Sequence, residues 1–228
     1  MKKIIRIKRT AEKGRQFLEP FLYEGDGNET VIDFLEEINS RSEIVNADGK
    51  PSQPISFNCS CKEKKCGACA MVIDGKPRLA CTVHMRELKE NALIEPLSKF
   101  PVIRDLSVDR TIMYNGQETL KAWPEAPQEP MDTDAVRCLM CGLCLEVCPN
   151  YIPGSSFTGG AGVAGAARGM DSTDAAHTKG VKKEYMKHFF RDCGQSLSCV
   201  RICPMNIPLD KLQARLAKKK TVSKAPSL

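Results

Sequence analysis

The sequence predicts an α+β protein of two domains: a domain of strands and one helix over residues 1–106, and a helical domain over residues 107–228. Three observations support this prediction. Strand-like alternation of apolar and polar residues is confined to about the first 105 residues. Apolar residues recur at helical spacing after that point. Eleven of the twelve cysteines form three regular groups, one in the first domain and two in the second.

The first domain has the pattern of two hairpins around a helix. Residues 4–7 and 17–23 predict two pairing strands. Thr30 is the expected N-cap of a helix, because an apolar stripe follows it: Val31, Ile32, Phe34, Leu35 and Ile38. Residues 70–73 and 78–81, joined by an Asp-Gly turn, predict a hairpin after a cysteine-rich loop.

The second domain lacks strand signals. Residues 123–130 are rich in proline and predict a surface loop. Pro208 suits the first turn of a last helix that continues through Leu212 and Leu216. Another helix is expected just before Cys193, where five apolar residues fall at helical spacing: Val181, Tyr185, Met186, Phe189 and Phe190.

Composition narrows the class of protein. No run of about 18 apolar residues exists, so no membrane span is expected. The apolar stretch near Met1 is too short for a secretory signal, so export on its own signal is not expected. Without export, cysteines in this number indicate metal binding rather than disulfides.

The charge distribution argues against a nucleic-acid-binding protein. The formal net charge is +6, and residues 211–228 hold six Lys or Arg and no acid, which accounts for the whole excess. The rest of the chain is therefore neutral, whereas nucleic-acid binding needs a basic face on the fold. The basic tail is either a solvated terminus or a contact for anionic lipid headgroups.

The first cysteine group has the plant-type spacing C-x4-C-x2-C…C of a [2Fe–2S] site, with Cys61, Cys66, Cys69 and Cys81 as predicted ligands. Gly67 lets the backbone turn tightly between ligands. Three lysines in this loop (Lys62, Lys64, Lys65) either offset the thiolate charge or form an ordinary exposed charge run. Cys59 is expected to be a structural thiol, because using it as a ligand would change the spacing. Hairpin, helix, metal-binding loop and hairpin is the element order of a β-grasp plant-type ferredoxin domain.

The second and third groups predict a bacterial-ferredoxin-like domain with two clusters. Residues 138–149 read C-x2-C-x2-C-x3-C-P, in which the last cysteine serves the other cluster. The third group overlays the same run, with Ser196 at the second cysteine position. The predicted ligands are therefore Cys138, Cys141, Cys144 and Cys203 for [4Fe–4S], and Cys148, Cys193 and Cys199 for a cluster whose fourth corner faces Ser196. A hydroxyl is a poor ligand for this iron, so [3Fe–4S] is the expectation and serine ligation of a fourth iron the alternative.

Other metal and nucleotide sites fit less well. Zinc knuckles would use the pairs Cys66/Cys69 and Cys141/Cys144, but zinc gives no reason for the run ending in proline. No histidine pair accompanies the cysteines, which excludes a Rieske centre. Residues 160–165 match G-x-G-x-x-G but follow no strand, so close packing of a helix on small residues is the better interpretation.

The three motifs in this order resemble the iron–sulfur subunit of succinate dehydrogenase and fumarate reductase. Residues 66–69, 100–106, 138–149 and 192–204 look like that family's landmarks. The resemblance implies a subunit that catalyses no bond changes itself. It implies electron relay between the FAD of a flavoprotein subunit and the haem or quinone of a membrane anchor. The subunit would then lie peripherally on the cytoplasmic face of the cell membrane, held by that anchor.

One departure indicates the type of anchor. Family members beside a ubiquinone site usually have a Trp and a His where this chain has Pro153 and Gly194. The chain therefore resembles members that pair with a di-haem cytochrome b anchor and menaquinone. The alternative hypothesis is a polyferredoxin-like electron carrier of another dehydrogenase or of a disulfide reductase.

Overall fold

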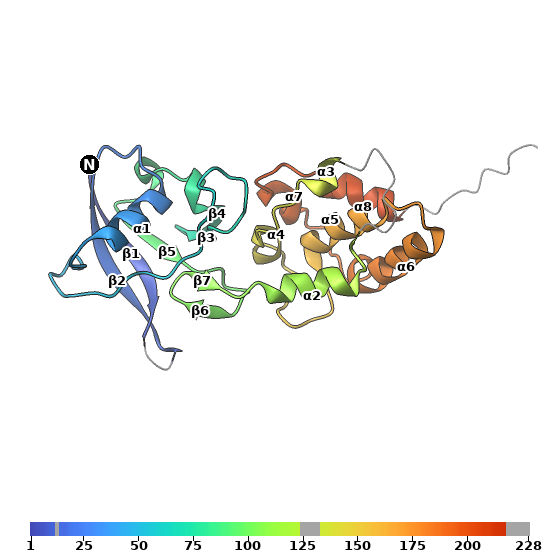
Figure 1. Cartoon of the computed structure of the whole chain (residues 1–228), viewed down its shortest axis with the longest axis horizontal. Coiled ribbons are helices and arrows are strands. Elements are labelled where there is room, and N and C mark those ends of the chain that lie inside the picture. Colours follow the sequence, from blue (N-terminus) through green and yellow to red (C-terminus); the bar gives the residue numbers. More distant parts are fainter. Residues whose placement is uncertain (12–13, 124–132, 218–228) are drawn as a thin grey trace, which may run out of the picture.

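The computed structural model describes residues 1–11, 14–123 and 133–217, and places a sheet domain beside a helical domain along the long axis of the molecule (Figure 1). This confirms the predicted α+β class. The described residues do not include residues 124–130 of the predicted proline-rich loop. They also do not include the basic tail beyond residue 217. No helix among the described residues is long and apolar enough to cross a membrane.

The sheet domain is built on five strands in the order β2-β1-β5-β3-β4. β1 (Lys2–Thr10) pairs antiparallel with β2 (Gln16–Glu24) and parallel with β5 (Asn91–Glu95). β3 (Ala70–Ile73) pairs antiparallel with both β5 and β4 (Lys76–Leu79). The two predicted hairpins are confirmed, and β5, which sequence patterning missed, joins them into one sheet.

Helix α1 (Val31–Ser40) buries the predicted apolar stripe. Its N-terminus is a capping box: the Thr30 hydroxyl accepts from the Asp33 amide, and the Asp33 carboxylate accepts from the Thr30 amide. Thr30 is therefore the N-cap, as predicted.

The prediction that residues 78–81 all belong to a strand is wrong for the last two. β4 ends at Leu79, and Ala80 begins a 3₁₀ turn, η2 (Ala80–Thr82), in which its amide donates to the carbonyl of Cys69 at 3.0 Å. This turn places the buried Cys81 against the cysteine loop rather than along the hairpin. A second 3₁₀ turn, η3 (Met85–Glu87), leads toward β5.

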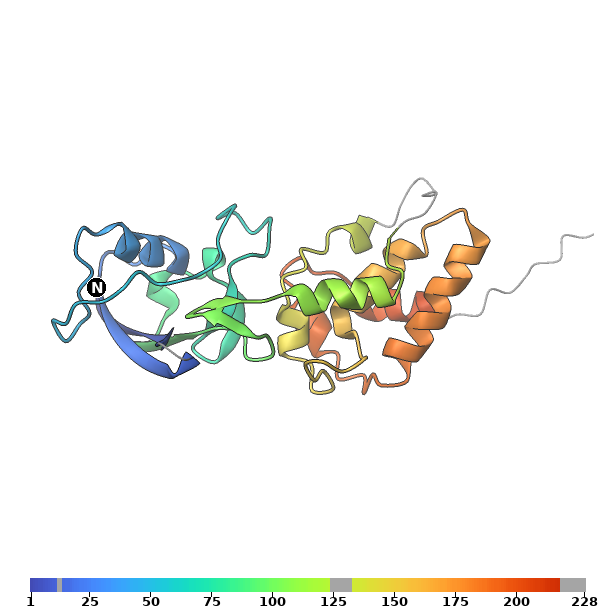
Figure 2. The same cartoon turned by 60° about the horizontal axis from the view of Figure 1, so that its bottom comes forward.

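A small hairpin carries the chain from one domain to the other. β6 (Val102–Arg104) pairs with β7 (Ser107–Val108), and the chain then enters α2 (Thr111–Thr119), a path visible in both views (Figure 2). The predicted division after residue 106 falls in the turn of this hairpin and stays a prediction. Asp105 in that turn is almost fully buried and ion-pairs with the buried Arg9 at 3.2 Å, which fixes the hairpin to the sheet.

The helical domain is arranged around α5 (Gly159–Gly169), which packs most closely against the α-helices that surround it. They are α2, α3 (Thr133–Val136), α4 (Leu143–Glu146), α6 (Ala175–Tyr185) and α8 (Leu209–Ala217). Nearly every residue of α5 is buried, and its small side chains let neighbours approach closely; a Cβ at Gly162 would lie 2.9 Å from Leu120 Cδ1. The G-x-G-x-x-G match is thus a packing feature, as the sequence analysis favoured.

The predicted helix before Cys193 is α6, which continues as a π-helical turn, η4 (Met186–Phe190). Tyr185 and Phe189 are buried in it, whereas Phe190 is exposed. α7 (Ser198–Ile202) carries Cys199 and ends directly before Cys203. α8 follows Pro208 directly, and the Pro208 carbonyl accepts from the Leu212 amide, which confirms the predicted start of the last helix.

Candidate iron–sulfur cluster sites

The first cysteine loop bends its backbone so that amides point at sulfur. Lys62, Lys64 and Gly67 all have positive φ. The Cys61 Sγ accepts hydrogen bonds from the amides of Glu63 and Lys65, at 3.4 and 3.2 Å. These two donors lower the pKa of Cys61 to about 7. The loop therefore stabilises a thiolate before any metal binds, which suits an iron ligand.

The four predicted ligands of the first group fall into two interacting pairs. Cys61 interacts with Cys66, and the buried Cys69 interacts with Cys81. Burial, as the largest cause, raises the pKa of Cys69 to about 12. A buried thiol of this kind becomes a thiolate only when a metal takes the place of its proton. Two pairs of thiols fit a two-iron cluster held by four cysteines.

The lysines of the loop were expected either to offset the thiolate charge or to form an ordinary exposed charge run, and their ion pairs distinguish the two. Lys62 forms an ion pair with Glu36 of α1, and Lys65 pairs with Glu63 at 2.7 Å. Both ammonium groups are thus engaged with carboxylates, which favours an exposed charge run over compensation of the thiolates.

Cys59 is partly buried against the core, and burial raises its pKa. Burial raises the pKa of the predicted ligand Cys69 in the same way, so the role of Cys59 as a structural thiol stays a prediction.

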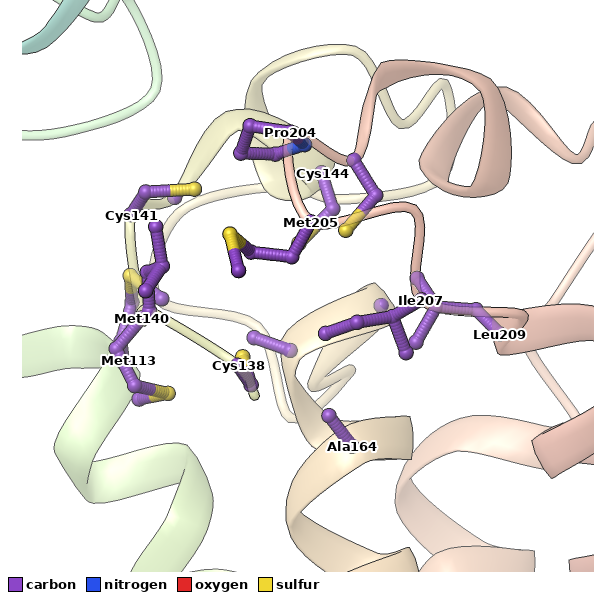
Figure 3. A pocket seen from close by; sticks show the side chains of 15 residues that line it. Met113, Cys138, Met140, Cys141, Cys144, Ala164, Pro204, Met205, Ile207 and Leu209 are labelled. Atoms are coloured by element: carbon purple, nitrogen blue, oxygen red, sulfur yellow. The ribbon is translucent and has the colours of Figure 1, made fainter. Parts of the chain in front are cut away.

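The second site is an apolar pocket lined by four cysteines from two segments that are distant in sequence: Cys138, Cys141 and Cys144 from one, and Cys203 from the other. Figure 3 labels the first three of them. Methionine and aliphatic side chains complete its wall, among them Met113 of α2 and Leu209 of α8. Burial raises the pKa of Cys141 to about 11 and that of Cys144 well above its ordinary value. Soft thiolates in a dry, apolar wall suit an iron–sulfur cluster.

The third site is a separate pocket that brings together Cys148, Cys193 and Cys199 with Ser196. Burial first, and then the neighbouring cysteines, raises the pKa of Cys199 to about 11. Ser196 itself is exposed, and its Oγ accepts a weak hydrogen bond from the Ser198 amide at 3.4 Å. The three thiols and the serine therefore stand around the same space, as the overlay of the two motifs predicts.

Within residues 1–11, 14–123 and 133–217, no three His, Cys, Asp or Glu side chains converge on a point that could hold a single metal ion. In the second and third groups the thiols instead surround a pocket. Thiols placed around a pocket fit the predicted iron–sulfur sites.

Two glycines bring the three sites into contact. A Cβ at Gly67, between ligands of the first site, would lie 2.8 Å from the Cβ of Cys141 in the second. A Cβ at Gly160 would lie 3.1 Å from the Cβ of Cys144 and 2.9 Å from that of Cys199, in the second and third sites. Sequence reasoning gave Gly67 a turn between ligands and an amide that can donate toward sulfur, and gave Gly160 a packing role; it did not predict that either glycine contacts cysteines of another site.

Further contacts fix the two domains against each other. The carboxylate of Glu146 in α4 accepts from the Ser98 amide at 2.9 Å and from the Lys99 amide at 3.1 Å. The Lys99 ammonium also donates to the Cys148 carbonyl. Phe100 packs on Gly142, whose Cβ would lie 2.8 Å from the phenyl ring. The loop after β5 thereby holds the helix that carries Cys144.

Comparison with known proteins agrees with this geometry. Residues 2–115 match the family model described as "2Fe-2S iron-sulfur cluster binding domain", and residues 134–207 match "4Fe-4S dicluster domain". The chain is 35% identical over 198 residues to the succinate dehydrogenase iron–sulfur subunit of Bacillus subtilis, covering 80% of this chain and 78% of that protein. It belongs to the family of iron–sulfur subunits of succinate dehydrogenase and fumarate reductase.

Other relatives of this iron–sulfur subunit extend the comparison. The fumarate reductase iron–sulfur subunit of Wolinella succinogenes is 30% identical over 189 residues, covering 72% of this chain and 77% of that protein. An uncharacterized iron–sulfur protein of Methanocaldococcus jannaschii is 32% identical over 212 residues, 86% of this chain but 39% of that longer protein. A chain of the Mycobacterium smegmatis Sdh1 complex in the apo form has the same fold, with a TM-score of 0.72 at 22% identity, covering 98% of this chain and 99% of that one.

Proposed function

We propose that this chain is the electron-transfer subunit of a succinate dehydrogenase or fumarate reductase complex. It relays electrons between the FAD of a flavoprotein subunit and the haem or quinone of a membrane anchor. The observation that carries the proposal is the contact between successive cysteine groups at Gly67 and Gly160, because electron transfer requires closely spaced carriers. When bound, the clusters supply one-electron redox chemistry, and the chain positions and tunes them.

The ligand assignment is part of the proposal. Cys61, Cys66, Cys69 and Cys81 hold [2Fe–2S]; Cys138, Cys141, Cys144 and Cys203 hold [4Fe–4S]. Cys148, Cys193 and Cys199 hold [3Fe–4S], with Ser196 at the vacant corner. The Ser196 hydroxyl supports this last point, since it is exposed and already accepts a hydrogen bond from the Ser198 amide.

The iron content tests the relay. We expect about nine irons in the complex purified without oxygen, two plus four plus three, and the EPR signals of all three clusters. A preparation with about four irons, or with stoichiometric zinc, contradicts the proposal. Copurification with a flavoprotein and an anchor would separate this function from that of a carrier for another dehydrogenase.

We further propose that the anchor is a di-haem cytochrome b that works with menaquinone and holds this subunit on the cytoplasmic face of the membrane. Pro153 and Gly194 support this, because neither side chain can donate a hydrogen bond to a quinone. The position of Gly194 is also crowded: a Cβ there would lie 2.9 Å from the Oδ1 of Asn150, so a histidine could enter only by moving that amide.

Asn150 and Gln195 provide the test of the anchor type, since both carry exposed side-chain amides that line the third site. We expect one variant with both Asn150→Ala and Gln195→Ala to leave succinate-dependent haem reduction and the affinity for quinone unchanged. Loss of quinone reduction in this variant, with haem reduction intact, would place a quinone at the third site and contradict the di-haem route.

A further inference from the structure

Arg110 joins the first cysteine loop to the start of the helical domain. It stands at the N-cap of α2, at the point where the chain passes between the domains. Its Nη1 donates to the carbonyl of Gly67 at 2.9 Å, and its Nη2 donates to the carbonyl of Ala68 at 2.7 Å. These are the two residues between Cys66 and Cys69. One guanidinium thus holds the short segment between two ligands of the first site.

The same guanidinium lies near sulfurs of two different sites. Cys66 and Cys69 of the first group and Cys141 of the second all act on its charge. Burial lowers the pKa of Arg110, but an arginine keeps its proton in a protein. The peptide that it holds also touches Cys141, through the close approach at Gly67. A permanent positive charge is therefore shared by the first and second sites.

One donor of Arg110 is left over. Its Nε–H is buried and has no hydrogen-bond partner within the part of the chain that the structure describes. Leaving a buried donor of a charged group unpaired costs free energy. This cost is offset because the neighbouring thiols become negatively charged when they bind iron. A positive charge and an unpaired donor beside them then stabilise the site.

We propose that Arg110 is a positioning residue for electron transfer between the first and second sites: it holds the 66–69 segment against Cys141, and its charge raises the reduction potentials of both clusters. The inference rests on the proposed function. Reduction adds negative charge to a cluster, so a fixed positive charge nearby stabilises the reduced state. The third site, beyond Gly160, has no such contact with Arg110 and serves as an internal reference.

Two substitutions separate the charge from the hydrogen bonds. Arg110→Gln removes the charge and keeps an amide donor, whereas Arg110→Lys keeps the charge and loses the two parallel N–H donors of the guanidinium. Arg104→Gln is the control, because Arg104 ends β6, six residues before Arg110, and its exposed side chain forms only a long ion pair of 3.8 Å with Asp105. Each variant is made in the complete complex, and midpoint potentials are measured by EPR-monitored redox titration together with iron content.

We expect Arg110→Gln to lower the [2Fe–2S] and [4Fe–4S] midpoints by about 59 mV, a tenfold change in a one-electron equilibrium constant. The [3Fe–4S] midpoint should stay unchanged, and Arg110→Lys should shift the first two by less than half as much. If Arg110→Gln loses the first cluster while Arg104→Gln keeps it, the positioning role is supported. The potential is then read at the second site of Arg110→Lys, where a lowering of less than half of about 59 mV is expected.

Three results would overturn the inference: shifts in Arg110→Gln no larger than in Arg104→Gln, equal shifts at all three sites, or Arg110→Lys behaving like Arg110→Gln. The wild-type complex distinguishes this failure from failure of the proposed function. If wild type shows all three EPR signals and the variants do not differ, only the role of Arg110 is wrong. If wild type lacks those signals, the relay itself is wrong.

Discussion

Gly67 and Cys141 are in contact across the junction of the two domains: a Cβ placed on Gly67 would lie 2.8 Å from the Cβ of Cys141. Gly67 has a φ of +72°, so glycine is favoured here both by backbone conformation and by space. One peptide unit of the first cysteine loop therefore lies directly on a predicted ligand of the second site.

We expect Gly67→Ala to impair the first two sites more than its backbone strain alone explains. The left-handed conformation costs alanine about 1–2 kcal/mol, and the new methyl group must also displace Cys141. Gly75→Ala is the control, since Gly75 has a φ of +74° and no atom within 4 Å of its Cβ position. Iron content and EPR of both variants check this. Equal iron loss in both would show that the contact with Cys141 does not matter.

Gly160 gives the corresponding prediction for the second and third sites. Its backbone lies in helix α5, so Gly160→Ala introduces no strain in φ, but the methyl group would meet Cys199 and Cys144 at 2.9 and 3.1 Å. We expect loss of the [4Fe–4S] and [3Fe–4S] EPR signals with the [2Fe–2S] signal retained.

The control for Gly160 is Gly116→Ala in α2, where the nearest atom to the new Cβ is the Thr158 Cγ2 at an ordinary 3.6 Å. This variant should keep all three signals and gain about 0.4–1 kcal/mol of stability by reducing the freedom of the unfolded chain. A Gly160→Ala protein with a full set of clusters would mean that the two pockets can move apart freely.

Local features of the sequence were sufficient for much of the fold. The capping pair Thr30 and Asp33 are three residues apart, so the start of α1 could be predicted without knowing the tertiary structure. The cysteine spacings likewise gave the sets that line the second and third pockets. β5 was missed because its pairing partners lie far away in sequence, with no adjacent turn to mark it: Ile5 of β1 pairs with Ala92.

The residues that join the sites could not be predicted for the same reason. Arg110 donates to Gly67, 43 positions earlier in the chain, and no spacing rule connects them. Gly160 lies against Cys199 from the third group and Cys144 from the second, a contact that exists only once α5 is at the centre of the helical domain. Spacing predicts the ligands of each group, but contacts between groups depend on the tertiary fold.

We expect Asp105, in the family landmark formed by residues 100–106, to stabilise the folded protein. The Asp105 carboxylate is 1% exposed, pairs with Arg9, and accepts the amides of Thr10 and Ser56 at 2.8 and 2.9 Å. Asp105→Ala leaves the buried Arg9 partly unpaired, which costs about 3–5 kcal/mol of unfolding free energy. Urea denaturation checks this, with the exposed Asp48→Ala as control. A loss below about 1 kcal/mol would contradict a structural role, because that is the range of surface ion pairs.

Ser196 decides the identity of the third cluster. We expect Ser196→Cys to convert [3Fe–4S] toward [4Fe–4S], because a soft thiolate becomes available beside Cys148, Cys193 and Cys199. The EPR signal of the oxidised [3Fe–4S] cluster should fade in this variant, and iron content should rise by about one.

Two further variants make the test of Ser196 decisive. Ser198→Cys adds a thiol two residues away, at a position that does not line the pocket, and should keep the [3Fe–4S] signal. Ser196→Ala should also keep it, since the hydroxyl is expected to hydrogen-bond the Ser198 amide rather than iron. If wild type lacks the oxidised signal and Ser196→Ala acquires it, serine is holding a fourth iron, and the vacant corner proposed here is wrong.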